Sequence, residues 1–314
     1  MNVAQTTGTG ASETEITFYS LAEALKSPEQ VVRLDLHYKN LTELPKEIFS
    51  FANLKELVLL NNKIAEIPDE IAKLTKLQKL DLCGNKISSI PNAVCELKNL
   101  RTLVLGWNDV TELPARIGEL KNLEWLSLNN NRISALPDSI CELVNLRELI
   151  LSENQIYELP ENIGNLVNLE KLRVPANRLT TLPDSICQMT KLVKIEAQEN
   201  SLVSLPEQIG KLANLQKLRL YKNLIQALPE SLCELRKLEK LLLYENELKA
   251  LPEGFGKLEN LVQLELSLNE ITEFPENFTN LKKLESLDIS KNYFSTAEIE
   301  RVHSALQNTM IVIE

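Results

Sequence analysis

Residues 123–145 read LEWLSLNNNRISALPDSICELVN, and residues 146–168 read LRELILSENQIYELPENIGNLVN. Leucines, one asparagine, a Leu-Pro step and one isoleucine recur at the same places, 23 residues apart. Stepping by 23 residues from Val31 gives twelve repeats without insertion or deletion. A period of this length indicates an array of stacked supersecondary units, each too small to bury its apolar face alone.

The residues of one repeat predict its local structure. Leu57 and Leu59 alternate with Val58 and Leu60, so in a strand the two leucines face the core and the other two face outward. The Leu-Pro step ends the strand stretch, because proline suits the first position of a short helical turn. The predicted fold is an α/β solenoid, a curved horseshoe with a parallel sheet on its concave side and short helices or 3-10 turns on its convex side.

Position nine of the repeat is asparagine in eleven of the twelve repeats. A buried amide can both donate and accept, so it can satisfy backbone groups where each strand turns away. We therefore expect a structural asparagine ladder rather than a reactive site. Its members are Asn62, Asn85, Asn108, Asn131, Asn154, Asn177, Asn200, Asn223, Asn246, Asn269 and Asn292.

Position nineteen alternates between cysteine and glycine over eight repeats, from Cys95 and Gly118 to Cys233 and Gly256. This 46-residue period indicates duplication of a two-repeat unit. Cysteines two repeats apart are separated by at least ~9.5 Å, beyond the ~7 Å reach of a disulfide, so they are expected to be free, convex and largely buried. Cys83 falls instead at position seven, on the concave face. It is the one candidate for a reactive thiol, although no nearby residue in the sequence indicates activation.

The two ends depart from the repeat, as array ends must. We expect a flexible N-terminal segment over 1–18, a capping helix over 19–30 opened by a Ser20–Glu23 capping box, the array over 31–294 with an atypical last repeat, and a C-terminal cap over 295–314. That cap should hold a helix from about Ser295 and a last short strand from Met310 to Ile313.

Composition excludes several functions. The net charge of −10 argues against nucleic-acid binding, and no apolar run is long enough to span a bilayer. The first residues lack a secretion signal, which favours the cytoplasm, although a chain whose signal had been removed would look the same. His37 and His303 lie at opposite ends of the array, and no catalytic, metal-binding or cofactor-binding motif is present. We expect a monomer.

The repeat resembles the leucine-rich-repeat superfamily from residue 31 to about 308. Its 23-residue Leu-Pro-x-x-Ile form is similar to Scribble-type and Ras-suppressor-type scaffolds, plant intracellular repeat proteins and many bacterial repeat proteins. The opening Ser20-Leu21-Ala22-Glu23-Ala24-Leu25-Lys26-Ser27-Pro28 resembles spirochaete and Bacteroidetes members. The resemblance implies a non-catalytic module that binds other molecules, often a protein, without fixing which one.

Two groups of side chains on the predicted concave face are candidate contacts for a protein ligand. The first comprises Trp107 and Trp125, with Val104 and Asn130 nearby; aromatic anchors are common in interfaces, but each indole could instead lie flat on its own strands. The second is Tyr221 and Tyr244 with Lys217, Arg219 and Lys222. This second group could meet an acidic peptide, or its charges could simply pair with Glu196, Glu199, Glu239 and Glu245. Pro175, at position seven between the groups, is expected to disturb its strand face locally and to divide the two groups.

Two other functions stay open from the sequence. Exposed aromatics can also stack on a glycan or surface polymer. A structural or self-assembling role through the array ends or the convex ridge is the third possibility.

Overall fold

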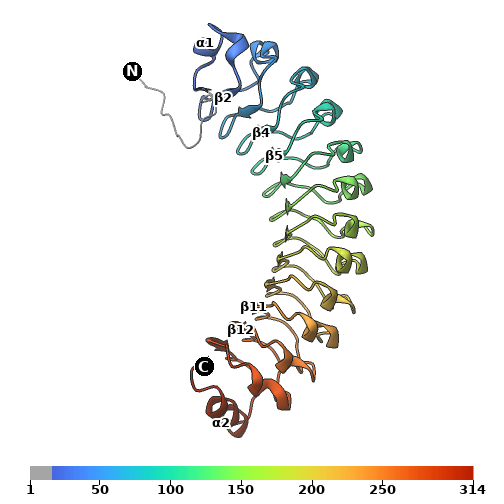
Figure 1. Ribbon diagram of the computed structural model, residues 1–314, viewed down its shortest axis with the longest axis vertical. Helices are drawn as coiled ribbons and strands as arrows, with labels where there is room; N and C mark the ends of the chain where they lie inside the picture. The colour runs from blue at the N-terminus through green and yellow to red at the C-terminus, as the bar shows by residue number, and fades with distance from the viewer. Residues whose placement is uncertain (1–15, 314) are drawn as a thin grey trace. The chain divides into compact units, whose positions relative to one another are not determined.

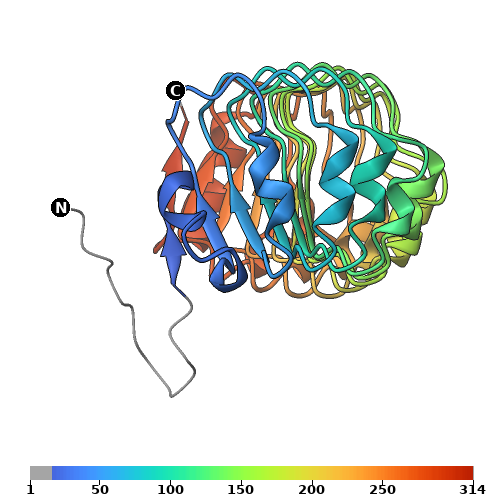
Figure 2. The same ribbon diagram turned by 90° about the horizontal axis from the view of Figure 1, so that it is seen from above.

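The computed structural model describes residues 16–313. The chain divides into two compact units, one running to Ile133 with Pro137–Leu146 added, the other containing Ser134–Leu136 and everything from Arg147 onward. In each unit, short strands line one side and 3-10 turns line the other (Figure 1). Seen along the stack in Figure 2, the helical turns of the first unit (blue to green) stand side by side.

The first unit contains six parallel strands that pair in chain order. They are β1 (Thr17–Phe18), β2 (Arg33–Asp35), β3 (Glu56–Val58), β4 (Lys79–Asp81), β5 (Thr102–Val104) and β6 (Trp125–Ser127). The helical layer comprises α1 (Leu21–Ala24) and the 3-10 turns η1 (Pro28–Gln30), η2 (Lys46–Ser50), η3 (Asp69–Lys73), η4 (Asn92–Glu96), η5 (Ile117–Glu119) and η6 (Asp138–Glu142).

The second unit contains eight parallel strands, again in chain order. They are β7 (Glu148–Ile150), β8 (Lys171–Arg173), β9 (Lys194–Glu196), β10 (Lys217–Arg219), β11 (Lys240–Leu242), β12 (Gln263–Glu265), β13 (Ser286–Asp288) and β14 (Met310–Val312). Opposite them lie η7 (Ile163–Asn165), η8 (Asp184–Gln188), η9 (Ile209–Lys211), η10 (Glu230–Glu234), η11 (Phe255–Lys257), η12 (Glu276–Asn280) and the helix α2 (Thr296–Ala305).

The alternating leucines place the core as the sequence predicts. Leu57 and Leu59 are fully buried, whereas Val58 and Leu60 are only half-buried on the opposite face. Leu57 lies in register with Leu34 and Leu80 on the neighbouring strands, so each leucine column packs against its own kind between repeats. The chain therefore has the predicted fold, a solenoid with a parallel sheet and short 3-10 turns.

The position-nine asparagines join each repeat to the one before it. Asn108 accepts a hydrogen bond from Ile87 N at 2.9 Å and donates to the carbonyls of Leu82 and Leu105, both at 3.0 Å. The same pattern recurs for Asn223, which binds Leu202 N, Ala197 O and Leu220 O. These amides satisfy buried backbone groups that no strand pairs with.

A second asparagine column, which the sequence reasoning passed over, runs along position twenty-three. Asn99 and Asn122 donate to the carbonyls of Thr75 and Lys98 in the preceding repeat, both at 2.8 Å. In several repeats a lysine from the next repeat caps the amide oxygen, as Lys237 does for Asn214 at 2.7 Å. The sequence signal was the repeated terminal asparagine of the 23-residue motif.

The two-repeat period has a structural counterpart in the helical layer. Cysteine-type repeats form five-residue turns such as η8, and glycine-type repeats form three-residue turns such as η7. Each glycine-type turn packs more closely on the turn that follows it than on the one before. The Gly164 N–H donates to Ser185 Oγ at 3.2 Å, and the Gly210 N–H donates to Ser231 Oγ at 3.4 Å. In these two pairs, a serine two residues before the cysteine joins the cysteine-type repeat to the glycine-type repeat before it.

Glycine is required at position nineteen because backbone from the next repeat occupies the space of a side chain. A Cβ on Gly118, Gly164, Gly210 or Gly256 would overlap the carbonyl oxygen of Ser139, Ser185, Ser231 or Asn277. In the repeats that alternate with these, position nineteen holds a cysteine. Cys95, Cys141, Cys187 and Cys233 are free and buried as expected.

Both ends differ in detail from the sequence-based boundaries. Thr17 and Phe18, assigned above to a flexible segment, form β1 and pair with β2, since the first open strand edge must be covered. The rest of that segment, up to residue 15, lies outside the described residues. Ser20 is the N-cap of α1 but makes no side-chain cap bond. At the other end, Ser295 does cap α2 through Glu298 N, and β14 follows.

Pro175 does not disturb its strand, which corrects the expectation from the sequence. Within the second unit, positions six, eight and nine donate the inter-repeat bonds that follow each strand. Val174 N donates to Glu196 O at 2.8 Å, Ala176 N to Gln198 O at 3.0 Å and Asn177 N to Glu199 O at 3.2 Å. The position-seven N–H takes no part in these bonds, so proline removes no donor that the ladder uses.

Candidate binding surface on the sheet face

The sheet face is defined here by the outward side chains of positions two, three, five, seven and eight. Positions three and five belong to the strands, and seven and eight to the loop that follows. Position eight adopts left-handed backbone in every repeat: Tyr38, Asn61, Gly84, Trp107, Asn130, Glu153, Ala176, Glu199, Lys222, Glu245, Leu268 and Lys291. Because an L side chain costs ~1–2 kcal/mol in this conformation, large side chains here are held against backbone preference.

The tryptophan patch consists of Trp107, Trp125, Val104 and Asn130, all in the first unit. Trp125 begins β6 in register with Thr102 of β5, and it is 39 % exposed. Trp107 follows β5 at a φ of 56° and is 61 % exposed. Within residues 16–313 neither indole stacks on another ring, so both present apolar surface outward.

Polar side chains fix the loop beside the tryptophans. Ser127 Oγ donates to Asn129 Oδ1 at 2.8 Å, and Asn129 Nδ2 donates to Asn130 Oδ1 at 2.8 Å. The Asn129 carbonyl accepts from Trp107 N at 2.8 Å. Gly106 leaves room for the Asn129 amide, because a Cβ there would lie against its oxygen. The loop that carries Trp107 is thus anchored at its backbone while the indole stays exposed.

The tyrosine patch consists of Tyr221 and Tyr244 and lies in the second unit. Tyr221 and Tyr244 stack with ring centroids 4.3 Å apart and planes 9° from parallel. Burial and the adjacent Tyr221 hydroxyl raise the pKa of Tyr244 above its ordinary range. Of the surrounding cations, Arg219 contacts Glu196 at 2.7 Å and Lys222 lies 3.6 Å from Glu199. The charge pairing considered from the sequence therefore holds for these two cations.

Two carboxylates, Glu148 and Glu196, are buried in this face, and the sequence reasoning missed Glu148. The Glu196 side chain is 9 % exposed and contacts Lys194, Arg219 and Arg173 at 2.7, 2.7 and 3.2 Å. The Glu148 side chain is 4 % exposed and lies 3.2 Å from Lys171 and 3.3 Å from Arg173. The available signal was the placement of both glutamates at outward strand positions among lysines and arginines.

The Cys83 thiol is not activated. It is only partly exposed, and burial together with the nearby Asp81 carboxylate raises its pKa. Burial likewise raises the pKa of Cys95 to about 11 and that of Cys233 to about 12. Because the thiolate is the nucleophile, none of these thiols is poised to react near neutral pH.

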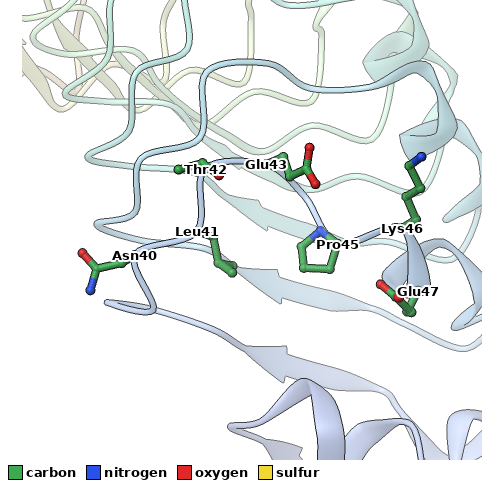
Figure 3. Close-up of a pocket in the computed structure, with 7 residues that line it drawn as sticks. All are labelled: Asn40, Leu41, Thr42, Glu43, Pro45, Lys46 and Glu47. Carbon is green, nitrogen blue, oxygen red and sulfur yellow. The ribbon is translucent and has the colours of Figure 1, made fainter.

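A pocket of about 440 Å³ follows one loop of the first repeat, from Asn40 to Glu47 (Figure 3). Its lining comes from consecutive residues, so no polar groups converge on it from separate elements, as a ligand site requires. Over residues 16–313 we find no cluster of three or more potential metal ligands, and no helix with the length and apolarity to cross a membrane.

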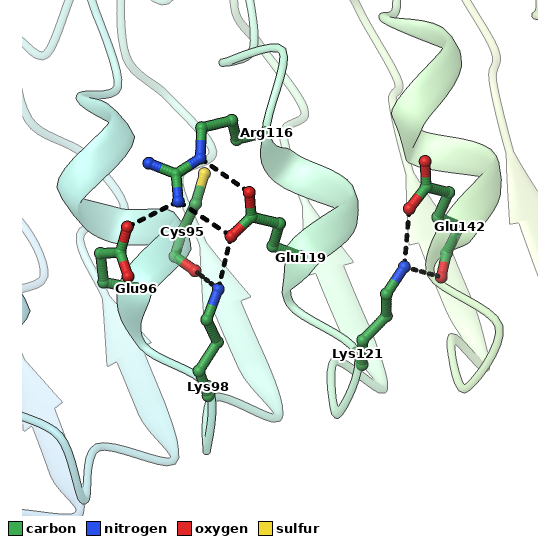
Figure 4. Close-up of polar contacts among 7 residues, drawn as sticks. All are labelled: Cys95, Glu96, Lys98, Arg116, Glu119, Lys121 and Glu142. Carbon is green, nitrogen blue, oxygen red and sulfur yellow. Dashed lines mark hydrogen bonds and ion pairs between the residues drawn. The ribbon is translucent and has the colours of Figure 1, made fainter.

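The convex layer of the first unit carries an ion network around Arg116 (Figure 4). Arg116 binds Glu96 at 2.7 Å and Glu119 at 2.7 Å, and Lys98 also binds Glu119, at 2.6 Å. These hydrogen bonds, first from Arg116 and then from Lys98, lower the pKa of Glu119 to about 2. All of these side chains are exposed, so we interpret the network as a solvated ridge.

Replacing Arg116 with methionine should raise the pKa of Glu119 towards its ordinary value of 4.5, because its strongest hydrogen-bond donor is lost. The Glu119 carboxylate is stabilised in the folded state, so its contribution is complete above pH 4.5 and lost as the pH falls towards 2. Side-chain NMR titration measures the midpoint. The control is Arg132→Met, because Arg132 pairs with Asp109 and takes no part in the Arg116 network. This variant should leave the Glu119 titration midpoint unchanged. An unchanged midpoint in Arg116→Met would contradict the network.

Comparison with known proteins agrees with this geometry. The family described as "Leucine-rich repeat region" matches four overlapping segments, residues 30–128, 92–154, 138–223 and 195–311. No curated protein matches significantly. An internalin of Listeria monocytogenes has 24 % identity and a TM-score of 0.80, with 91 % of this chain and 81 % of the internalin covered.

Two further solved structures are complexes. The Arabidopsis receptor kinase HAESA, solved with the peptide hormone IDA and the co-receptor SERK1, is similar at 31 % identity and a TM-score of 0.77. The match covers 91 % of this chain but only 50 % of that one. A chain in the complex of Latrophilin 3, Unc5D and FLRT2 has 26 % identity and a TM-score of 0.71, with 88 % and 87 % covered.

Proposed function

Because the chain belongs to the leucine-rich-repeat family, we propose that it is a non-catalytic module that binds a protein partner through its sheet face. The observation that carries this proposal is the tryptophan patch. Trp107 and Trp125 come from adjacent repeats, both are exposed, and Trp107 occupies left-handed backbone. Exposed aromatics in a fixed frame are the usual anchors of protein interfaces.

The similar structures support a polypeptide ligand. HAESA is solved with a peptide hormone and a co-receptor, and FLRT2 within a multi-protein complex. Within the family, the regular Leu-Pro-x-x-Ile repeat favours the 23-residue subclass, and the opening at Ser20 favours a bacterial lineage. A monomeric state, the cytoplasm as compartment and the lack of nucleic-acid binding stay predictions from the sequence.

Mutation of both tryptophans tests the proposal. The Trp107→Ala/Trp125→Ala variant should lose a partner captured from the native cell by the wild-type protein, while its thermal unfolding changes little. Tyr157, which is 51 % exposed away from the sheet face, provides the control variant Tyr157→Ala. Capture that survives in the double variant would place recognition elsewhere, and tryptophan-dependent binding to a glycan array would favour a glycan ligand.

The single variant Trp107→Gly separates binding from folding. Glycine adopts the left-handed backbone at no steric cost, so this variant should be as stable as the wild type or slightly more stable, and yet bind the partner more weakly. Light scattering at several concentrations checks the monomeric state in the same preparations.

A further inference from the structure

Four lysines form one row across the second unit. Lys171, Lys194, Lys217 and Lys240 are the first residues of β8, β9, β10 and β11, and each is the register partner of the next. Neighbouring strands lie ~4.8 Å apart, so the row spans roughly 14 Å. Like charges directly opposite each other destabilise a sheet, so the row does not serve the stability of the sheet. We call this set the lysine row.

The buried carboxylates neutralise only part of this charge. At strand positions three and five from β7 to β11, Arg173 and Arg219 add to the four lysines, against the two carboxylates Glu148 and Glu196. Those carboxylates bind Lys171, Arg173, Lys194 and Arg219. By contrast, Lys217 and Lys240 have no acidic partner within 4.0 Å in the described part of the chain. The excess positive charge is thus greatest beside the tyrosine patch.

The loop residues that follow these strands can contact an apolar or hydrogen-bonding group of a ligand. Tyr221 and Tyr244 follow the strands that carry Lys217 and Lys240, and their rings form one continuous stacked surface. One repeat earlier at the same position, Gln198 is 9 % exposed, and its buried Oε1 accepts no hydrogen bond within residues 16–313. A buried acceptor without a donor is costly, and a peptide N–H would satisfy it.

We propose that the lysine row and the tyrosine patch bind an extended acidic segment of a protein partner, with carboxylates at alternate positions. This inference rests on the proposed function and specifies the chemistry of the ligand. In an extended peptide, alternate side chains lie ~6.8 Å apart on one face, so three of them span roughly the same 14 Å as the four lysines. The segment would cross the strands, with its carboxylates over the ammonium groups and a neighbouring residue on the tyrosine rings.

The surroundings favour a peptide over a nucleic acid or another dense polyanion. Acidic residues at positions two and eight border the row, namely Glu170, Glu199, Glu239 and Glu245, and the whole chain carries a net charge of −10. Such borders repel a broad phosphate backbone but accommodate a narrow strand with a few carboxylates.

Fluorescence anisotropy with a defined probe tests the inference. The probe is a fluorescein-labelled hexapeptide with glutamate at its first, third and fifth positions and tyrosine at its sixth; its partner probe has glutamine in place of glutamate. The Lys217→Gln/Lys240→Gln variant should bind the acidic probe about tenfold more weakly than the wild type, because two ammonium contacts are lost. The glutamine probe should bind far more weakly throughout.

The matched control is Lys191→Gln/Lys237→Gln, which removes two exposed lysines that pair with Asn168 and Asn214 outside the sheet face. It should retain near wild-type affinity. No binding of the acidic probe, an equal loss in the control variant, or tighter binding of a single-stranded oligonucleotide of similar length would overturn the inference. Capture of a partner through Trp107 and Trp125 is assayed separately. If only the peptide assay fails, the proposed function stands. If the capture assay also fails, the proposed function is overturned too.

Discussion

Asn223→Ala is expected to lower the free energy of unfolding by about 3–5 kcal/mol, because three buried backbone groups lose their partner at once. Asn223 Oδ1 accepts from Leu202 N at 3.0 Å, and Nδ2 donates to Ala197 O at 3.1 Å and Leu220 O at 2.9 Å. Each backbone group left unsatisfied in the interior costs about 1–3 kcal/mol. Methyl-sized alanine neither replaces these bonds nor admits water easily.

Urea-induced unfolding followed by circular dichroism measures the change, fitted with nearest-neighbour coupling between repeats. Asn214→Ala is the matched control, because Asn214 also bridges two repeats but does so in exposed positions, through Thr190 O at 2.8 Å. It should cost no more than about 1 kcal/mol. Equal losses of unfolding free energy in the two variants would contradict the prediction, because burial of the position-nine asparagines would then add little to stability.

Most of the fold could be predicted because one 23-residue pattern is repeated so often. Leu57 and Leu59 are buried by strand alternation alone, and the asparagine at position nine has few physical roles other than satisfying backbone. The two ends of the array were harder to predict. β1 at Thr17 pairs with β2, yet two residues are too few to leave a periodic signal in the sequence.

The sheet face could be predicted as a surface but not as a pattern of contacts. Trp107 and Trp125 were identified because tryptophan is rare in this chain. The left-handed backbone at position eight was not foreseen, since Glu153, Lys222 and Leu268 adopt it without the glycine that usually signals it. The 23-residue period makes Lys217 and Lys240 neighbours, as the register of β10 and β11 confirms. That neither has an acidic partner within 4.0 Å among the described residues follows only from the side-chain positions in the structure.

The two-repeat period was visible in the sequence, but its cause was not. Alternation of cysteine and glycine at position nineteen suggested only duplication. The structure adds a steric reason, because the glycine-type turn lies so close to the following turn that no Cβ fits between them. This reason can be tested with single methyl groups.

Gly256→Ala is expected to lower the free energy of unfolding by about 2–3 kcal/mol, the usual cost of forcing an extra methyl group into a packed interior. The new Cβ would overlap the Asn277 carbonyl, which is backbone and cannot rotate away. Any shift of η11 away from η12 would also stretch the 2.8 Å bond from Gly256 N to Asn277 Oδ1. The steric overlap and the stretched hydrogen bond therefore both destabilise the folded state of the Gly256→Ala variant.

Gly254→Ala, two residues earlier in the same repeat, is the control. A Cβ there would meet chiefly the Glu230 carboxylate, the far end of a flexible side chain, and alanine also restricts the unfolded chain, which favours folding by ~0.4–1 kcal/mol. Its net effect should stay below about 1 kcal/mol in either direction. If urea unfolding ranked the two alanine variants equally, close approach of backbone could not be why glycine recurs at position nineteen, and the alternation would reflect only the history of duplication.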